Sequence, residues 1–139
     1  MKRMHMGITV NDLEAATAFY TRLLGQEPSL VRDDYVKWML DDPYLNLSIN
    51  TSTCGDNGPG VSHLGFQVDS IDDVNAVRQE WVDAGLSPQD QNDLVCGYQL
   101  QDKSWVFDPA ELPWEVFVTH GVADDYGTNE MPDPAATQP

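Results

Sequence analysis

The sequence predicts an α+β fold built from two β-α-β-β-β units related by pseudo-twofold symmetry. Three observations predict it: a strand motif that occurs twice, an amphipathic helical segment after each copy, and alternating apolar segments after each helix. The chain has 139 residues, a length that suits one domain. We expect this domain to span residues 1–121, with repeats at 3–52 and 61–120, and the acidic, Pro-rich segment 122–139 to be a disordered tail.

The repeated motif reads His, apolar, Gly, apolar, polar, Val, and then Asn or Asp. It begins at His5 and again at His63, 58 residues later. Both copies alternate as strands do, and the two histidines hold the same position in their strands. Two copies of one unit packed around a pseudo-twofold axis would therefore bring His5 and His63 together.

A helix is expected after each copy of the motif, because polar capping residues precede an apolar stripe and a glycine follows it. The capping and terminating residues are Asn11 or Asp12 with Gly25, and Asp69 or Ser70 with Gly85. The strands that follow are expected at 27–31, 35–40 and 45–50, then within 87–96 and at 98–107 and 114–119. Asp-Pro turns separate the last two strands of each unit.

A third candidate ligand is Glu115, a carboxylate among the apolar residues of the last strand. Burying an unpaired carboxylate is costly, so we expect Glu115 to be neutralised or to bind a metal. If Trp114-Glu115-Val116 aligns with Leu45-Asn46-Leu47, the symmetry-related position is Asn46, a weak ligand. Two imidazoles and one carboxylate leave coordination positions open and suit Fe(II), while Mn(II), Ni(II), Co(II) or Zn(II) also fit.

Each of these residues also has a simpler explanation. A histidine in a strand often only packs or is exposed, and Glu115 could face outward. It is the matching position of His5 and His63, together with Glu115 on the expected partner strand, that favours a metal site. His120 lies beyond the expected end of the last strand, and we expect it at the surface.

Composition narrows the class of protein and of partner. The net charge of −16 argues against nucleic acid and anionic lipid as partners and fits a solvated acidic surface. No apolar run reaches the length of a membrane helix and no signal peptide is visible, so a cytoplasmic protein is expected. Two cysteines, Cys54 and Cys96, are too few for a disulfide framework, and we expect free thiols.

These residues resemble the vicinal-oxygen-chelate superfamily, which includes glyoxalase I, extradiol dioxygenases and bleomycin- and fosfomycin-resistance proteins. Four segments are similar to one subfamily, the bacterial carbon–arsenic lyases and cadmium-induced proteins. They are Ser62-His63-Leu64-Gly65, Cys96-Gly97-Tyr98, Gln101-Asp102-Lys103-Ser104-Trp105-Val106-Phe107-Asp108-Pro109 and Trp114-Glu115-Val116-Phe117. The resemblance covers residues 3 to about 120.

The resemblance implies an enzyme that uses Fe(II) and O2 to split the carbon–arsenic bond of trivalent organoarsenicals, with His5, His63 and Glu115 as metal ligands. In that subfamily two adjacent cysteines before a tyrosine hold the arsenic, but here the pair reads Cys96-Gly97, so one thiolate is missing. Cys54 could act as the second thiol, but no motif places it near Cys96. The residues expected to bind substrate are Cys96, Tyr98, Gln101 and Lys103, although Lys103 could also be an exposed strand lysine.

Two other functions stay open. An extradiol-type dioxygenase or a glyoxalase-like isomerase would keep the metal, but the isomerase normally needs a second carboxylate, and Asn46 cannot serve. A drug- or heavy-metal-sequestering protein would use the same fold without turnover. The partner expected is a small molecule, and a homodimer is expected as well; the sequence does not decide whether the units pair within one chain or between two. Trp38, Trp105 and Phe66 could line a substrate site or belong to the core.

Overall fold

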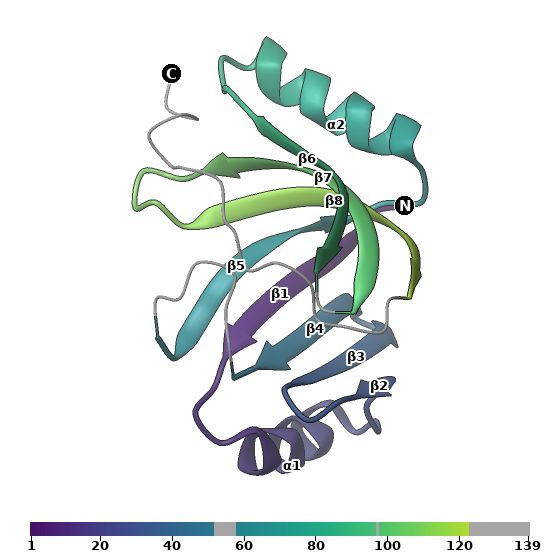
Figure 1. Ribbon diagram of the computed structural model, residues 1–139, viewed down its shortest axis with the longest axis vertical. Coiled ribbons are helices and arrows are strands. Elements are labelled where there is room, and N and C mark those ends of the chain that lie inside the picture. Colours follow the sequence, from purple (N-terminus) through teal and green to yellow (C-terminus); the bar gives the residue numbers. More distant parts are fainter. Residues whose placement is uncertain (52–57, 97, 123–139) are drawn as a thin grey trace.

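The structure confirms the α+β prediction and its two β-α-β-β-β units. A computed structural model describes residues 1–51, 58–96 and 98–122. The helices and strands of this described part are β1 (Arg3–Thr9), α1 (Leu13–Leu24), β2 (Leu30–Val31), β3 (Tyr35–Asp41), β4 (Tyr44–Asn50), β5 (Gly60–Gln67), α2 (Ile71–Asp83), β6 (Gln89–Cys96), β7 (Gln99–Phe107) and β8 (Pro113–Val122). The strands form one mixed sheet in the order β2-β3-β4-β1-β5-β8-β7-β6 (Figure 1).

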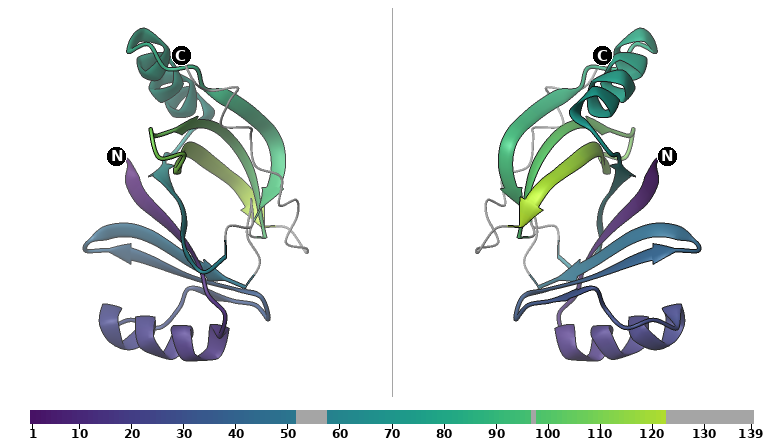
Figure 2. Two further views of the ribbon diagram at one scale, coloured as in Figure 1. Left: turned by 90° about the vertical axis from the view of Figure 1, so that its left-hand side faces the viewer. Right: turned by 90° about the vertical axis from the view of Figure 1, so that its right-hand side faces the viewer.

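The two units join through their first strands. β1 and β5 pair antiparallel, while β1 runs parallel to β4 and β5 runs parallel to β8. The two halves therefore pair within one chain, a point that the sequence left open. The sheet bends into a U, with α1 outside one arm and α2 outside the other (Figure 2).

The local signals explain where the helices begin and end. The Asp12 side chain accepts a hydrogen bond from the Ala15 backbone N–H, and the Ser70 side chain does the same for Asp73, so the second of the two expected caps is used each time. Gly25 ends α1 in the left-handed conformation, with φ of 66°. α2 leads through Ala84 into Gly85, which also has a positive φ.

Two strands differ from the prediction. The strand expected at 27–31 is reduced to β2, because Pro28 has no N–H with which to extend the pairing toward Glu27. The last strand runs on to Val122 instead of stopping at Thr119, because β7 is long enough to pair with it from Phe107 back to Gln99. His120 consequently lies inside β8.

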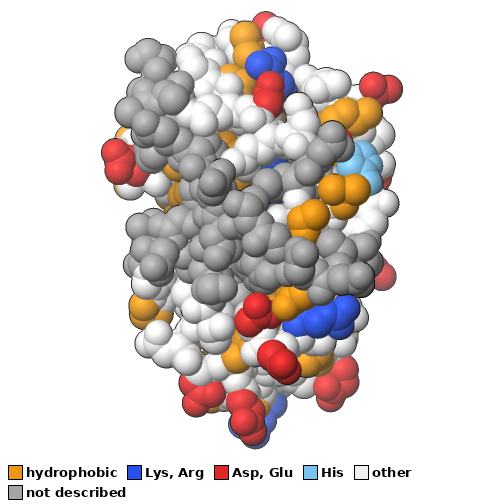
Figure 3. All heavy atoms as spheres, viewed as in Figure 1, with side chains coloured by type: hydrophobic (Ala, Val, Ile, Leu, Met, Phe, Trp, Pro, Cys, Tyr) orange, Lys and Arg blue, Asp and Glu red, His pale blue; other side chains and the backbone are white. Residues whose placement is uncertain are grey.

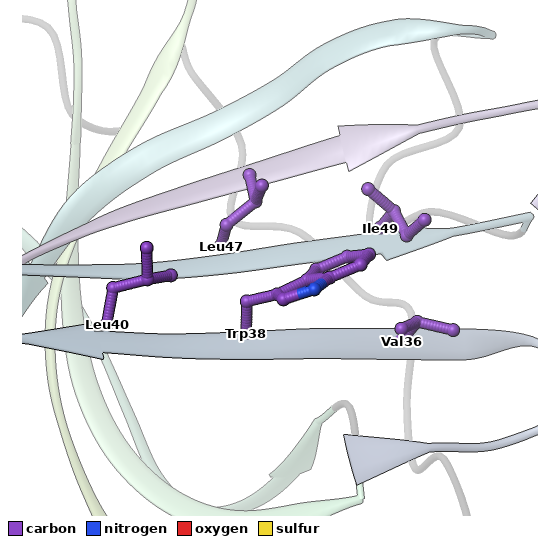
Figure 4. Close-up of a cluster of buried hydrophobic side chains, with 5 residues drawn as sticks. All are labelled: Val36, Trp38, Leu40, Leu47 and Ile49. Atoms are coloured by element: carbon purple, nitrogen blue, oxygen red, sulfur yellow. The ribbon is translucent and has the colours of Figure 1, made fainter. Parts of the chain in front are cut away.

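Apolar side chains fill the helix-covered face of each half of the sheet. In the first half, five residues of β3 and β4 pack beneath α1 (Figure 4): Val36, Trp38, Leu40, Leu47 and Ile49. In the second half, Val116 and Val118 of β8 pack with Val74 and Val77 of α2. Side chains alternate along a strand, so residues at the intervening positions face the inside of the U, the concave face.

This arrangement assigns two of the aromatic residues considered above to the helix-covered face. Trp38 is fully buried in the cluster under α1. Phe66 pairs in register with Val116, which lies in the α2 cluster, and its ring contacts Trp114. Neither residue reaches the concave face.

The acidic residues are spread over the surface, as expected, and do not form one patch on the face seen in Figure 3. In the described ranges, neither helix combines the length and the apolarity that crossing a membrane requires. Val122, the first residue of the expected tail 122–139, instead ends β8. Cys54, Gly97 and residues 123–139 lie outside the described residues.

Candidate metal centre

The three predicted ligands meet on the concave face, where β1, β5 and β8 are neighbours in the sheet. Nε2 of His5 lies 2.9 Å from Nε2 of His63. Oε1 of Glu115 lies 3.5 Å from the first of these nitrogens and 3.6 Å from the second. His5 and Glu115 are buried and His63 is nearly so. Within the described residues, this is the one group of three or more His, Cys, Asp or Glu side chains close enough to share a metal ion.

Strand register explains how the repeat assembles this group. His5 pairs with Gly65 across β1 and β5, and His63 pairs with Gly7. A Cβ atom at Gly7 would lie 2.3 Å from Cε1 of His63, and one at Gly65 would lie 2.2 Å from the backbone oxygen of Glu115 and 2.7 Å from its Cγ. Each glycine of the His-x-Gly motif therefore makes room for a ligand on the next strand. The glycines were visible in the sequence, but their function follows from the pairing.

The symmetry-related position of Glu115 is Ser48, so the predicted alignment with Asn46 is wrong. Glu115 pairs with Gly65 of β5, and the equivalent pair in the first unit is Ser48 with Gly7 of β1. Asn46 instead pairs with His5. Both residues lie in apolar-polar-apolar triplets two positions apart, and the alternation of a strand cannot tell such triplets apart.

Hydrogen bonds to the outer ring nitrogens set the tautomers of both imidazoles. Nδ1 of His5 lies 3.1 Å from the Asn46 backbone carbonyl, which can only accept, so Nδ1 carries the proton. Ser62 donates its hydroxyl to the Gly7 carbonyl and lies 2.9 Å from Nδ1 of His63, so this Nδ1 also donates. The two Nε2 lone pairs then face each other at 2.9 Å without a proton between them.

Burial keeps both imidazoles neutral. Burial lowers the pKa of His63 to about 3, although Glu115 acts in the opposite direction. Burial also lowers the pKa of His5 below its ordinary value, again against the pull of Glu115. For Glu115, burial by itself would raise the pKa, but the opposing effect of its charged neighbours, Lys103 foremost, lowers the pKa below its ordinary value. Two neutral imidazoles and one carboxylate are the protonation states that metal binding requires.

The geometry fits a divalent transition-metal ion. Metal–nitrogen and metal–oxygen bonds of about 2.1 Å place neighbouring ligand atoms about 3.0 to 3.4 Å apart in octahedral or tetrahedral coordination. The three separations here are 2.9, 3.5 and 3.6 Å. A cation between the two Nε2 lone pairs and Oε1 would relieve the repulsion among them. The outer contacts to Asn46 and Ser62 are of the kind that orient metal-binding histidines.

Lys103 is part of this group and is not an exposed strand lysine. Its side chain is almost fully buried, and Nζ lies 2.9 Å from Oε2 of Glu115. The two carboxylate oxygens thus have separate partners: Oε1 faces the histidines and Oε2 faces Lys103. The ring of Trp105 packs against the ring of His63, with 5.8 Å between the two ring centroids. Trp105 also donates its indole N–H to the side-chain oxygen of Gln91.

Two other predicted site residues, Gln101 and Tyr98, make polar contacts with residues that are not metal ligands. Gln101 is buried on β7, on the same face as Lys103, and its amide lies 3.5 Å from the Thr119 hydroxyl. Tyr98 donates its hydroxyl to Asp34 of the first unit at 2.6 Å, and this bond raises the pKa of Tyr98.

Three further sequence predictions concern cysteines and a histidine. The backbone of Cys96 ends β6, but its side chain lies outside the described set, as does all of Cys54. His120 is exposed and pairs with Asp102 at 2.6 Å, away from the metal centre, which agrees with its expected place at the surface.

Comparison with known proteins identifies the family of the chain and agrees with its fold. A family model described as the glyoxalase/bleomycin resistance protein/dioxygenase superfamily matches residues 2–116. A trivalent organoarsenical cleaving enzyme of Bacillus sp. (strain MD1) is 38% identical over 130 residues, which cover 93% of this chain and 80% of that protein. The cadmium-induced protein CadI of Mycobacterium tuberculosis (strain H37Rv) is 33% identical over 130 residues, covering 92% and 83%.

A similar fold is found in a solved structure. Homoprotocatechuate 2,3-dioxygenase from Brevibacterium fuscum superposes with a TM-score of 0.63 at 18% identity, covering 91% of this chain and 34% of that one. At that identity the likeness speaks for the fold alone. The family match across most of the chain and the relatives above 30% identity together show that the chain belongs to the glyoxalase/bleomycin resistance protein/dioxygenase superfamily.

Proposed function

We propose that this chain is an Fe(II)-dependent enzyme that uses O2 to cleave the carbon–arsenic bond of trivalent organoarsenicals. The observation that carries the proposal is the meeting of two imidazole lone pairs and a carboxylate oxygen at metal-binding separations on the concave face. The choice of reaction rests on the relative from Bacillus, which is named for organoarsenical cleavage. Such a three-ligand set leaves positions open for small molecules.

The residues of the chain have distinct roles in this proposal. His5, His63 and Glu115 hold the metal, which when bound supplies a place to bind and activate O2 beside the substrate. The Asn46 carbonyl and the Ser62 hydroxyl keep both Nε2 atoms directed inward. Lys103 holds Oε2 of Glu115, so that Oε1 stays turned toward the histidines.

Substrate capture falls to residues at the ends of β6 and β7. Cys96 would bind the trivalent arsenic as its thiolate, a soft ligand for a soft atom. With Gly97 as its neighbour, a single thiolate does this work, and we expect weaker capture than by an adjacent cysteine pair. Tyr98 and Gln101 would contact the organic part of the substrate.

The test is turnover by protein that has been loaded anaerobically with Fe(II). Phenylarsenous acid and methylarsenous acid are added with O2, and arsenite release and oxygen consumption are followed together. We expect arsenite release and oxygen consumption in the wild type and in His120→Gln, and neither in His63→Gln. The His120 variant makes the same chemical change at an exposed histidine outside the centre. Absence of arsenite from the loaded wild type would contradict the proposal.

The alternatives predict other results from the same preparation. A glyoxalase-like isomerase is disfavoured, because the position related to Glu115 by symmetry holds Ser48, which is not a second carboxylate. A sequestering protein would bind Cd(II) or As(III) without turnover and would lose this binding in Cys96→Ser. An extradiol-type dioxygenase would consume oxygen with catechols and not with arsenicals.

A further inference from the structure

A second lysine, Lys37, faces the same concave surface as the metal centre. Lys37 of β3 pairs with Ser48 of β4, Ser48 pairs with Gly7 of β1, and Gly7 pairs with His63 of β5. Residues paired in register point to the same side of a sheet, so Lys37 and His63 share one face. The neighbours of Lys37 along its strand, Val36 and Trp38, point the other way, into the core under α1.

Pseudo-symmetry relates Lys37 to Trp105, which packs against the metal centre. Ser48 and Glu115 are equivalent positions; Ser48 pairs with Lys37, and Glu115 pairs with Trp105. Lys37 therefore occupies in the first unit the place that Trp105 occupies in the second, where Trp105 contacts the ring of His63.

The charge of Lys37 has no counter-charge within the described part of the chain. The side chain is partly buried, and its Nζ makes no ion pair or hydrogen bond there. Lys103, by contrast, is neutralised by Glu115. Burial alone lowers the pKa of Lys37, with no neighbouring charge as a further cause. Burying an ammonium group without a partner is costly. The chain has a net charge of −16, and yet none of its described acidic residues pairs with Lys37.

Lys37 also lies near a residue that the sequence assigned to substrate binding. Tyr35 is two positions before Lys37 on β3 and so faces the same side. Its ring is 6.0 Å from the ring of Tyr98. Lys37 thus lies on the concave face of β3, two positions along the strand from the residue that contacts Tyr98.

We propose that Lys37 binds an anionic group, such as a carboxylate or sulfonate, on the substrate that occupies the concave face beside the metal. This proposal rests on the proposed function only in placing the substrate there. An anion would supply the counter-charge that the described chain lacks, and a half-buried ion pair of this kind is stronger than one in open water. The substrate class is therefore an acidic small molecule, with the reacting atom at the metal and an anionic substituent at Lys37.

The test measures equilibrium binding to metal-loaded protein without oxygen, so that turnover plays no part. Two probe pairs differ only in charge: phenylarsenous acid against its 4-carboxy derivative, and catechol against 3,4-dihydroxybenzoate. The variants are Lys37→Gln, Lys37→Arg and, as a matched control, Lys2→Gln. Lys2 is an exposed lysine near the Phe66 ring on the helix-covered face.

We expect the carboxylated member of at least one pair to bind about tenfold more tightly to the wild type, to Lys2→Gln and to Lys37→Arg, and to lose this advantage in Lys37→Gln. If only the catechol pair shows this pattern, the inference stands and the organoarsenical function falls. If Lys37→Gln leaves the preference for carboxylated probes unchanged, or if the wild type binds no carboxylated probe better than its neutral partner, the inference is overturned.

Discussion

Replacing Gly7 by alanine should weaken metal binding while the fold is kept. A Cβ at this position would lie 2.3 Å from Cε1 of His63 and 2.7 Å from both ring nitrogens. Ordinary contact begins near 3.4 Å. The imidazole must therefore move as a whole by at least about 1 Å away from Gly7, because the new methyl group is fixed to the strand.

A displacement of this size is large compared with a metal–nitrogen bond of about 2.1 Å. Losing the support of one ligand lowers metal affinity by at least about 10- to 100-fold, or roughly 1.4 to 2.7 kcal/mol. Overpacking a buried site also lowers the free energy of unfolding by about 1 to 3 kcal/mol. The change in metal affinity should thus be measurable in a protein that still folds.

The assay is a competition titration of Fe(II) or Co(II) against a chelator under anaerobic conditions, alongside urea unfolding of the metal-free proteins. Gly121→Ala is the matched control, since a Cβ there meets no atom within 4 Å and the residue lies on a strand of the same sheet. Equal metal affinity in Gly7→Ala, Gly121→Ala and the wild type would refute the argument that Gly7 exists to seat His63.

Three further predictions concern the charges around the site. Lys103→Met should lower the free energy of unfolding of the metal-free protein by about 3 to 5 kcal/mol, because it leaves the charge of Glu115 buried and unpaired, and adding Glu115→Gln should restore most of the loss in urea unfolding; no recovery in the double variant would contradict the ion pair. Acid should destabilise the metal-free protein: an unfolded histidine with a pKa of 6.5 takes up a proton that folded His63, with a pKa of about 3, does not, so stability falls as the pH drops through this window, by up to about 2 kcal/mol between pH 7 and pH 5. His63→Gln should flatten that dependence, and an unchanged slope would argue against a neutral buried imidazole. Tyr98→Phe should lower the free energy of unfolding by about 1 kcal/mol, since it removes the hydrogen bond to Asp34 between the two units, whereas a neutral effect would show that this bond contributes nothing in solution.

The fold could be predicted from the sequence because the same short-range signals occur in it twice. The His-x-Gly strand and the capping residue recur 58 residues apart, and a glycine follows each helix at or just beyond its end. The approach of His5 and His63 followed from their equivalent positions alone. Glu115 followed from its chemistry, as a carboxylate in an otherwise apolar strand.

The parts that the sequence could not show depend on strand register. Asn46 and Ser48 have the same alternating surroundings, so only the observed pairing of β1 with β4 identifies Ser48 as the counterpart of Glu115. The same holds for Lys103, whose burial depends on β7 lying beside β8. Lys37 gave no sequence signal at all, because its face of β3 is set by the packing of its neighbours under α1.

The central claim is that His5, His63 and Glu115 together hold one divalent metal ion. The most direct measurement is elemental analysis of protein reconstituted anaerobically with Fe(II) and then desalted, for the wild type, His5→Gln, Glu115→Gln and the surface control His120→Gln. The account predicts about one ion per chain in the wild type and in the control, and nearly none in the two ligand variants. Metal that is absent from the wild type, or retained equally in all four proteins, would contradict it.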